Sequence, residues 1–465
     1  MSPKNITARI AESIAATRFD DLPAAVVEAA KDHILDGVAT MIAGAREDAS
    51  VHTRRYIAKL GAPRESTIFG ARIKTAARYA ALANGVQGHV LDYDDTQLAT
   101  SAKIPFGQLT HPTTPVLAAA LALAEKYSSR GKELLTAYIV GVEVACRLAD
   151  AIDPRHYLDG FHPTGTIGVF GAAAASARLA GLDERRIRWA LGLAGTFSAG
   201  VRANRGSMAK ALNAGRAAEN GVVAAELARL GFTAAENIFD APMGFFSAAS
   251  RNNVDGARLK FGRPFFFSAP GVAIKRYPCA GVLHSALDAA IDLATRHQIA
   301  VSSIEKITLT MGNVSAAPLV YDRPMTGLQG KFSAPFSVAV ALLDRAAGLG
   351  EYVDAKANDS KVKALMRKVT LVRDARLDAA GFEHARARLE IRLRDGRSYR
   401  AESRPPKGHP KNPLTRRELE DKFQQCAAPY LAPRSIERII ATIRSIENVR
   451  SVPAMMADFR RASAE

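Results

Sequence analysis

The sequence is poor in cysteine and lacks a long apolar run. Its 3 cysteines, Cys146, Cys279 and Cys426, are widely spaced and odd in number, which argues against a disulfide framework or a zinc cluster. The longest apolar stretch, residues 116–124, is about half of the ~18–20 residues that cross a bilayer. Residues 1–21 have polar and acidic side chains where a signal peptide needs an apolar block. We expect a cytoplasmic protein with no membrane partner.

Aromatic residues are also scarce, at 7% of the chain, whereas hydrophobic residues make up 48% and charged residues 23%. This balance is typical of a folded globular protein and excludes a disordered chain. The many alanine-rich segments favour closely packed helices over sheets. Because 465 residues exceed what one ordinary core accommodates, we expect two domains.

The net charge is strongly positive, at +17 from 63 basic and 46 acidic residues. A basic balance is typical of proteins that bind nucleic acid. Here, however, lysine and arginine are spread along the chain, without a basic tail or an aromatic stacking platform. A basic surface also concentrates small polyanionic substrates. We expect a solvated basic surface first, attraction of anionic substrates second, and no nucleic-acid partner.

Residues from Leu22 to about 265 show helical patterns and no clear strand. Pro23 suits the first turn of a helix, and apolar residues then recur at spacings of three and four from Val27 to Met41, as on the buried face of a helix. The same helical pattern of residues predicts helices at 76–83, 115–127, 132–150, 169–182, 185–194 and 210–230.

The pattern changes near Phe265, after which alternating residues predict strands. Apolar and polar residues alternate in 304–311 and again in 387–393, as in strands with one buried face. Asp395-Gly396 follows the second of these and is a hairpin signal. Residues 369–372 form a further strand candidate, and 284–297 form an alanine-rich helix. We assign 266–404 to an α+β domain.

Helical sequence resumes after Pro405-Pro406, where Thr415 and Glu418 form a capping box. We expect the last ~50 residues to pack on the first domain. The predicted fold class is therefore mainly α. A large all-helical domain, discontinuous over 1–265 and 405–465, accompanies a smaller α+β domain. No internal repeat is visible.

The densest cluster of chemically active residues lies between His89 and His111. Asp92, Asp94 and Asp95 fall within four positions, Thr96 follows, and His111 stands in a Thr-His-Pro step. Oxygen-rich sets of this kind suit Mg²⁺ or Ca²⁺, although the spacing is not that of an EF-hand. They also suit an acid–base site. A helix end with solvated acids is the third interpretation, and the spacing alone does not choose among the three.

Two further segments offer polar groups at helix starts. His162 precedes a helix, where the positive end of the helix dipole favours a neutral imidazole. Nearby glycines do not form a dinucleotide loop, because no strand precedes them. Lys210 stands in the first turn of the next helix, against the dipole, and such local conflicts concentrate at functional sites. Arg205 and Ser207 lie just before it.

The α+β domain contributes its own candidates. Lys275 and Arg276 precede Cys279, and His284 lies on the helix that follows. Two cations beside a histidine can hold carboxylates, whereas Cys279 is interpreted as an apolar filler. Tyr321 lies in a turn, either at the rim or in a cleft between the domains.

The order of these segments carries a family resemblance. The strings NGVQGHVLDYDDT…THP, GFHPTGTIGVFGAAAASARLAGLD, GSMAKALNAGRAAENGVVAAELARLGFTA, KRYPCAGVLHSALDA and KGHPKNPLTRRELEDKF resemble the MmgE/PrpD family. The resemblance covers roughly Ile6 to Ile440. That family comprises 2-methylcitrate dehydratases, cis-aconitate decarboxylases and iminodisuccinate epimerases.

The resemblance implies a homodimer with a helical domain and an α+β lid, the active site between them, and no metal or other cofactor. By motif match, the family's site residues correspond to Asp92, Thr96, His111, His162, Lys210, His284 and Tyr321. We expect catalytic roles for Asp92, Thr96, His111, His162, Lys210 and Tyr321, and substrate-binding roles for Lys275, His284, Arg205 and Ser207. Asp92 would orient a histidine or act as a neutral acid. Two departures concern the substrate: Asn213 stands where the family string has His, and the interval from Thr96 to His111 is longer than in the decarboxylases.

The shared chemistry implied is abstraction of a proton next to a carboxylate of a small di- or tricarboxylate. A neutral histidine is a suitable base, and lysine or arginine stabilises the developing negative charge. We favour epimerisation as the outcome, because it needs only two proton-transfer groups on opposite faces. A dehydratase of a 2-methylcitrate-like substrate is the alternative, followed by a cis-aconitate-type decarboxylase.

Overall fold

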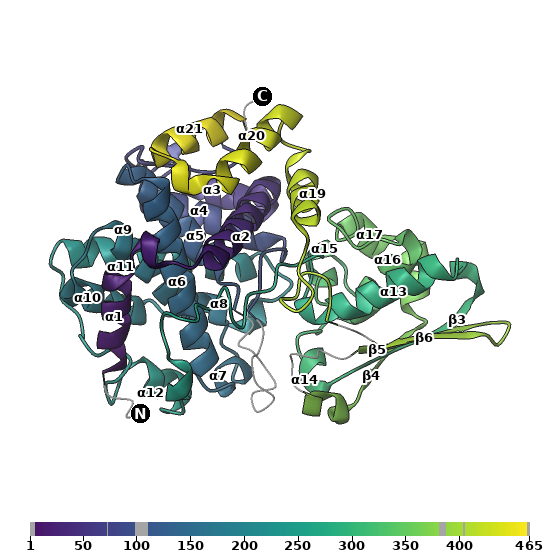
Figure 1. The fold of residues 1–465 in the computed structure, drawn as a ribbon. Helices are drawn as coiled ribbons and strands as arrows, with labels where there is room; N and C mark the ends of the chain where they lie inside the picture. Colours follow the sequence, from purple (N-terminus) through teal and green to yellow (C-terminus); the bar gives the residue numbers. More distant parts are fainter. Residues whose placement is uncertain (1–4, 72, 98–109, 381–386, 403–404, 463–465) are drawn as a thin grey trace.

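The computed structural model describes residues 5–71, 73–97, 110–380, 387–402 and 405–462. Figure 1 shows a large helical part beside a smaller part that carries a sheet. The predicted fold class, mainly α with a smaller α+β region, is confirmed. Among the described residues, no helix combines the length and the apolar composition needed to cross a bilayer.

The larger part is built mainly from helices. Those before residue 260 are α1 (Ile6–Ala16), α2 (Ala24–Ala43), α3 (Asp48–Ala58), α4 (Ala77–Val90), α5 (Thr113–Lys126), α6 (Gly131–Ala151), α7 (Arg155–Leu158), α8 (Pro163–Thr166), α9 (Gly168–Leu179), α10 (Glu184–Thr196), α11 (Ala209–Arg229) and α12 (Phe245–Ser250). Those near the C-terminus are α19 (Arg416–Ala427), α20 (Pro433–Arg444) and α21 (Val452–Ala462).

Small residues set the spacing of the central helices. A Cβ added to Gly171 on α9 would lie 2.7 Å from the Gly141 carbonyl oxygen on α6. A Cβ on Gly85 of α4 would lie 2.8 Å from Cα of Gly215 on α11. Such close approach buries α5 almost completely. The central helices are thereby held close to the site described below.

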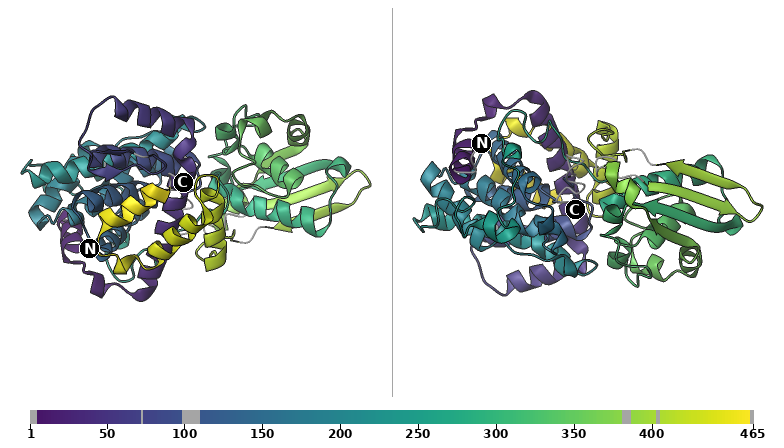
Figure 2. Two further views of the ribbon diagram at one scale, coloured as in Figure 1. Left: turned by 90° about the horizontal axis from the view of Figure 1, so that it is seen from above. Right: turned by 90° about the horizontal axis from the view of Figure 1, so that it is seen from below.

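The C-terminal helices return to the start of the chain. Phe423 of α19 and Phe459 of α21 belong to the same buried cluster as Ile34 of α2 and Leu117 of α5. Figure 2 shows α19–α21, in yellow, lying against the larger part. This contact is the one expected for a discontinuous helical domain, while the boundaries at 265 and 405 stay a prediction.

The smaller part contains a four-stranded sheet in the order β4-β3-β5-β6. Its strands are β3 (Ile304–Met311), β4 (Val369–Arg373), β5 (Ala387–Leu393) and β6 (Ser398–Glu402). β4 runs parallel to β3, and β5 pairs antiparallel with both β3 and β6. Ile307 and Leu309 lie opposite Ile391 and Leu389 in one buried cluster.

Helices accompany this sheet. They are α13 (His284–Arg296), α14 (Asn313–Ala316), α15 (Gly327–Gly330), α16 (Ala334–Asp344), α17 (Asp354–Asn358) and α18 (Ser360–Met366). α13 and α16 contact the strands, so alternate residues of β3 and β5 face a covered side. This explains why the alternation in the sequence located both strands correctly.

One local prediction was wrong in the larger part, which we expected to be all-helical. Two-residue strands, β1 (Ser66–Thr67) and β2 (Lys74–Thr75), form a small hairpin. Thr67 donates hydrogen bonds to the Glu125 carboxylate, and the Ser66 hydroxyl donates to the Ala122 carbonyl. These tertiary contacts set the pairing, which is too short to leave a periodic signal in the sequence.

A buried ion pair joins the C-terminal helices to α2. Lys422 Nζ lies 2.5 Å from the Asp36 carboxylate, and both side chains are buried. Lys422 Nζ also donates hydrogen bonds to the carbonyl oxygens of Tyr93 (2.9 Å) and Lys275 (2.7 Å). Burial raises the pKa of Asp36 to about 6, although the Lys422 ammonium opposes the rise.

Lys422→Met should destabilise the protein by about 3–5 kcal/mol at pH 7.5, since it leaves a buried carboxylate without its cation. Without Lys422 the pKa of Asp36 rises further, so the carboxyl protonates and the loss shrinks as the pH falls toward 5. Thermal melting by circular dichroism at both pH values measures this. Adding Asp36→Asn should recover part of the loss at pH 7.5. An equal loss of stability at both pH values would contradict the interpretation that Lys422 compensates the charge of Asp36.

Candidate active site

A cavity of about 500 Å³, including its open mouth, collects most of the predicted site residues. It is lined from the larger part by Asp92, Thr96, His111, Tyr157, His162, Arg205 and Lys210, and from the chain beyond residue 270 by Lys275, Ala280, Gly281, Val282, Pro318 and Phe332. The structure therefore brings together seven of the ten predicted residues, which lie far apart in the sequence.

Asp92 is the charged centre of this cavity. It follows α4 in a left-handed backbone conformation (φ 52°), which is uncommon outside glycine but tolerated by Asp. Its carboxylate forms ion pairs with Lys210 and, at 3.1 Å, with Lys275. Burial raises the pKa of Asp92, but the two ammonium groups outweigh burial and hold the pKa well below its ordinary value. Asp92 is thus an anion, which argues against the neutral-acid role.

The ion pair with Asp92 explains the unusual position of Lys210. The residue is in the first turn of α11, where a cation opposes the helix dipole. Burial lowers the pKa of Lys210, and the Asp92 carboxylate counteracts this. The local conflict in the sequence is compensated by a tertiary contact across 118 residues.

The segment 91–93 is held by three buried lysines. The carbonyl oxygen of Leu91 accepts from Lys331 Nζ (2.8 Å), that of Asp92 from Lys275 Nζ (2.9 Å), and that of Tyr93 from Lys422 Nζ (2.9 Å). Burial lowers the pKa of Lys331 to about 8. Lys331 and Lys422 were not among the predicted site residues. A single lysine in a polar stretch of sequence does not indicate that its ammonium group binds a distant backbone carbonyl.

His111 is held in one tautomer by its backbone surroundings. Its Nδ1 lies 2.7 Å from the carbonyl oxygen of Asp95, so Nδ1 carries the proton and Nε2 has the free lone pair. Its backbone N–H donates to the Thr164 hydroxyl at 3.1 Å. Burial lowers the pKa of His111 well below its ordinary value, and Lys275 and Lys210 lower it further. The imidazole is therefore neutral near pH 7.

His162 contacts Asn213 rather than a carbonyl group. The Asn213 amide nitrogen lies 3.1 Å from Nδ1 of His162, and the His162 backbone N–H donates to the Gly200 carbonyl oxygen. Burial, followed by neighbouring His89 and Lys210, lowers the pKa of His162 well below its ordinary value. This imidazole is neutral as well.

His89 lies between these two histidines and was not predicted as a site residue. Its ring centroid is 4.7 Å from that of His111 and 5.6 Å from that of His162. The sequence placed a helix only as far as residue 83, whereas α4 continues to Val90 and carries His89 into the site. Burial lowers the pKa of His89.

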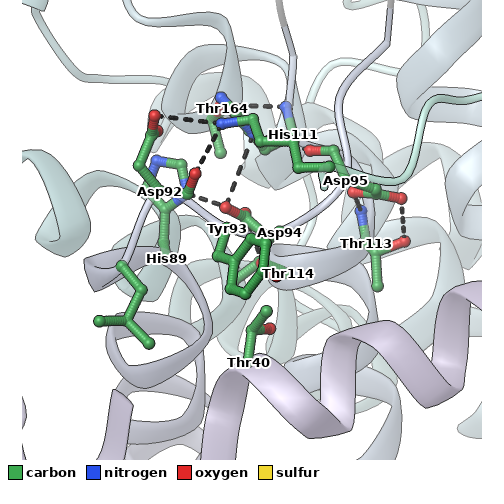
Figure 3. Close-up of polar contacts among 12 residues, drawn as sticks. Thr40, His89, Asp92, Tyr93, Asp94, Asp95, His111, Thr113, Thr114 and Thr164 are labelled. Carbon is green, nitrogen blue, oxygen red and sulfur yellow. Dashed lines mark hydrogen bonds and ion pairs between the residues drawn. The ribbon is translucent and has the colours of Figure 1, made fainter. Parts of the chain in front are cut away.

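The neighbouring acids Asp94 and Asp95 face the protein interior (Figure 3). Asp94 accepts hydrogen bonds from Nδ1 of His89 (2.8 Å) and from the Thr114 hydroxyl (2.7 Å). Asp95 accepts from the backbone N–H and hydroxyl of Thr113. Of the three clustered acids, only Asp92 lines the cavity, and the other two hold surrounding side chains.

A metal centre remained an alternative for this cluster. Among the described residues, His89, Asp94 and His111 lie close enough together to share one ion. Nδ1 of His89 contacts the Asp94 carboxylate and Nδ1 of His111 contacts the Asp95 carbonyl oxygen, so both imidazoles have hydrogen-bonding partners within the protein and need no ion to hold them. We pursue the acid–base interpretation, since the cavity also holds the ammonium groups of Lys210 and Lys275, which repel a metal cation.

Three predicted residues lie outside the main cavity. Ser207 lines a small adjoining cavity beside Lys210. The Tyr321 hydroxyl donates to the Arg205 carbonyl oxygen at 2.8 Å. His284 is buried with its ring against Tyr277. Their functional roles, like those of the cavity residues, stay predictions.

Six residues of the cavity wall were not predicted, and two of them, Tyr157 and Phe332, lie against predicted cations. Tyr157 accepts a hydrogen bond from the guanidinium of Arg205 at 2.5 Å and so helps to position this cation. Phe332 supplies an apolar surface 5.6 Å from Nζ of Lys210. Neither lies in a motif that sequence reasoning had identified. The longer interval noted between Thr96 and His111 falls on residues 98–109, outside the described residues.

Both parts of the chain match a known protein family. Residues 8–256 match the MmgE/PrpD N-terminal domain and residues 277–448 match the MmgE/PrpD C-terminal domain. The chain is similar to the cis-aconitate decarboxylase of Homo sapiens, at 28% identity over 97% of this chain and 93% of the relative. It is also similar to the cis-aconitate decarboxylase of Mus musculus, at 26% identity over 97% of this chain and 92% of the relative. The cis-aconitate decarboxylase of Aspergillus terreus strain NIH 2624 is 26% identical over 97% of this chain and 95% of the relative. With both domains matched in order, the chain belongs to the MmgE/PrpD family.

Proposed function

We propose that the protein is an enzyme that transfers a proton at a carbon next to a carboxylate of a small di- or tricarboxylate, using its own side chains and no cofactor. One observation carries the proposal. The same cavity holds cations that suit carboxylates and two neutral histidines that suit proton transfer.

The charge of the cavity favours a polyanionic substrate. Lys210, Lys275 and Arg205 line it, and Asp92 is the acid that lines it among the described residues. One carboxylate cannot neutralise three cations, so the empty site has an excess of positive charge. Carboxylates of a substrate would supply the missing anions through charge-assisted hydrogen bonds. The same cations would stabilise negative charge that develops as a carbon loses its proton.

The histidines supply the proton-transfer group. His111 presents an Nε2 lone pair that has no hydrogen-bonding partner among the described residues. Its pKa is low in the empty site, but carboxylates bound nearby would raise it. A histidine that becomes more basic as the substrate arrives can accept a proton from carbon or return one.

For the outcome we propose a lyase, with decarboxylation of an unsaturated tricarboxylate such as cis-aconitate first and dehydration second. Decarboxylation breaks the bond from carbon to one carboxylate, and the remaining carbanion takes up a proton. The relatives reported above are named cis-aconitate decarboxylases and align over nearly the whole chain. None of them is named an epimerase, so the epimerisation favoured from the sequence has no support among them.

We also propose a homodimer, as the resemblance implies. Exposed apolar side chains on neighbouring segments are consistent with a partner surface, among them Leu158, Phe161 and Val201. Phe161 and Val201 pair through a β-bridge, which places their side chains near one another. Light scattering that returned a monomeric mass would contradict this part of the proposal.

Incubation with cis-aconitate, 2-methylcitrate or iminodisuccinate in D₂O tests the reaction class. We expect deuterium to enter the carbon next to a carboxylate of at least one of them, measured by proton NMR and mass spectrometry. His111→Gln should slow incorporation by about a hundredfold or more. His52→Gln, on the exposed surface of α3, is the matched control and should leave the rate unchanged. No incorporation into any of the three would overturn the proposal.

Asp92→Asn tests the charge balance. Removal of the carboxylate that raises the pKa of Lys210 lets that pKa fall. If catalysis needs the lysine ammonium, the alkaline limb of the kcat/KM profile should move to lower pH. We expect a loss of about a hundredfold or more at pH 8. Asp322→Asn, an exposed acid outside the cavity, serves as control. An alkaline limb at the wild-type position would contradict the role of Lys210.

A further inference from the structure

The contact between Asn213 and His162 determines where the His162 proton resides. Asn213 lies on α11, one turn after Lys210, and its amide nitrogen is 3.1 Å from His162 Nδ1. An amide nitrogen donates hydrogen bonds and does not accept them. Nδ1 of His162 must therefore be the acceptor, which places the ring proton of the neutral imidazole on Nε2.

Close packing holds the Asn213 side chain beside the His162 ring. A Cβ on Gly200 would lie 3.2 Å from Asn213 Oδ1, and a Cβ on Gly165 would lie 3.3 Å from Asn213 Cβ. Both glycines are thus packed closely against the asparagine side chain. Gly200 also accepts the hydrogen bond from the His162 backbone N–H at 3.0 Å. One backbone segment therefore positions both partners of the contact.

The two cavity histidines consequently present different atoms to a substrate. His111 donates through Nδ1 to the Asp95 carbonyl, so its Nε2 is a proton acceptor. His162 accepts at Nδ1 from Asn213, so its Nε2–H is a hydrogen-bond donor. Loss of the remaining ring proton from a neutral His162 would leave an imidazolate, which is too basic to form here. His162 can donate a hydrogen bond but cannot serve as the base.

We propose that Asn213 is a positioning residue that keeps His162 as a hydrogen-bond donor to a substrate carboxylate or enolate oxygen, leaving His111 alone to exchange protons with carbon. This inference rests on the proposed function. In the step, His111 Nε2 takes the proton as the C–H bond breaks and becomes an imidazolium. The electron pair moves into the adjacent carboxylate, whose oxygen accepts the hydrogen bond from His162. In exchange, His111 then returns the proton to carbon. In decarboxylation, the bond from carbon to the departing carboxylate breaks instead, CO₂ leaves with the carbon of that bond, and a His111 that has taken up a proton from solvent gives it to the remaining carbanion.

Two substitutions of Asn213 separate this role from simple packing. Asn213→Asp keeps the shape but offers His162 only acceptor oxygens, so the ring proton should move to Nδ1 and the donor at Nε2 is lost. Asn213→Ala removes the contact but leaves the Nε2–H tautomer accessible. With cis-aconitate, kcat should fall about a hundredfold for the aspartate variant and less than about tenfold for the alanine variant.

The pH profile adds a readout that packing would not change. Burial, His89, Lys210, His111 and Arg205 all lower the pKa of His162, and a carboxylate at position 213 would oppose them. A protonated His162 carries a proton on Nε2 as well as on Nδ1, so the loss of kcat in the aspartate variant should shrink as the pH falls, whereas a packing defect would persist at all pH values. If the alanine variant loses as much activity as the aspartate variant and the loss in the aspartate variant is the same at all pH values, Asn213 is structural and the proposal fails.

NMR of the free enzyme labelled with ¹⁵N-histidine reads the tautomer without turnover. We expect Nε2–H for His162 and Nδ1–H for His111 in the wild type, and Nδ1–H for His162 in the aspartate variant. Nδ1–H for His162 in the wild type would overturn the inference. If instead these tautomers are found but no polycarboxylate exchanges deuterium, the proposed function fails and the tautomer assignment stands.

The exchange experiment also distinguishes the two histidines. A glutamine at position 162 can donate through its amide in place of Nε2–H, so His162→Gln should retain measurable deuterium incorporation. His111→Gln cannot accept the proton from carbon and should lose it. Equal loss in the two variants would contradict the division of roles.

Discussion

Three lysine ammonium groups bound to three consecutive carbonyl oxygens are the constraint on which the site depends. Lys331, Lys275 and Lys422 come from distant parts of the chain, yet all donate to residues 91–93. An ammonium group taken out of water must recover its hydrogen bonds, and these carbonyls provide them. The contacts hold Asp92 in its uncommon backbone conformation, so that its carboxylate faces Lys210 and Lys275.

The site is therefore organised before a substrate arrives, at a cost in desolvation. Charges of both signs are buried here, and burial alone would neutralise most of them. The Asp92 carboxylate stays ionised because two ammonium groups contact it. The histidines stay neutral because burial disfavours their charged form, and the Lys210 ammonium adds to this by repelling a further positive charge. A dianionic or trianionic ligand would relieve that repulsion, so affinity and basicity are expected to rise together.

Much of the fold and part of the site could be predicted from the sequence. Alternation located β3 and β5 because each strand has one covered face. The order of motifs along the chain identified His111, His162 and Lys210 as candidate site residues, and the structure places all three around one cavity. Lys331 could not be found in this way, since its partner carbonyl lies 240 residues away. A contact from an ammonium group to a backbone oxygen leaves no residue-type pattern at either end.

The return of α19 to the larger part has a consequence for synthesis of the chain. Tyr93 leaves the ribosome long before Lys422, which lies 329 residues later. At roughly 5–20 residues per second, the segment 91–93 waits about 16–66 s for the last of its three lysine partners. Until then Asp36 is buried without its cation or stays in water. The nascent protein is thus expected to remain without a formed cavity around Asp92 until translation is nearly finished.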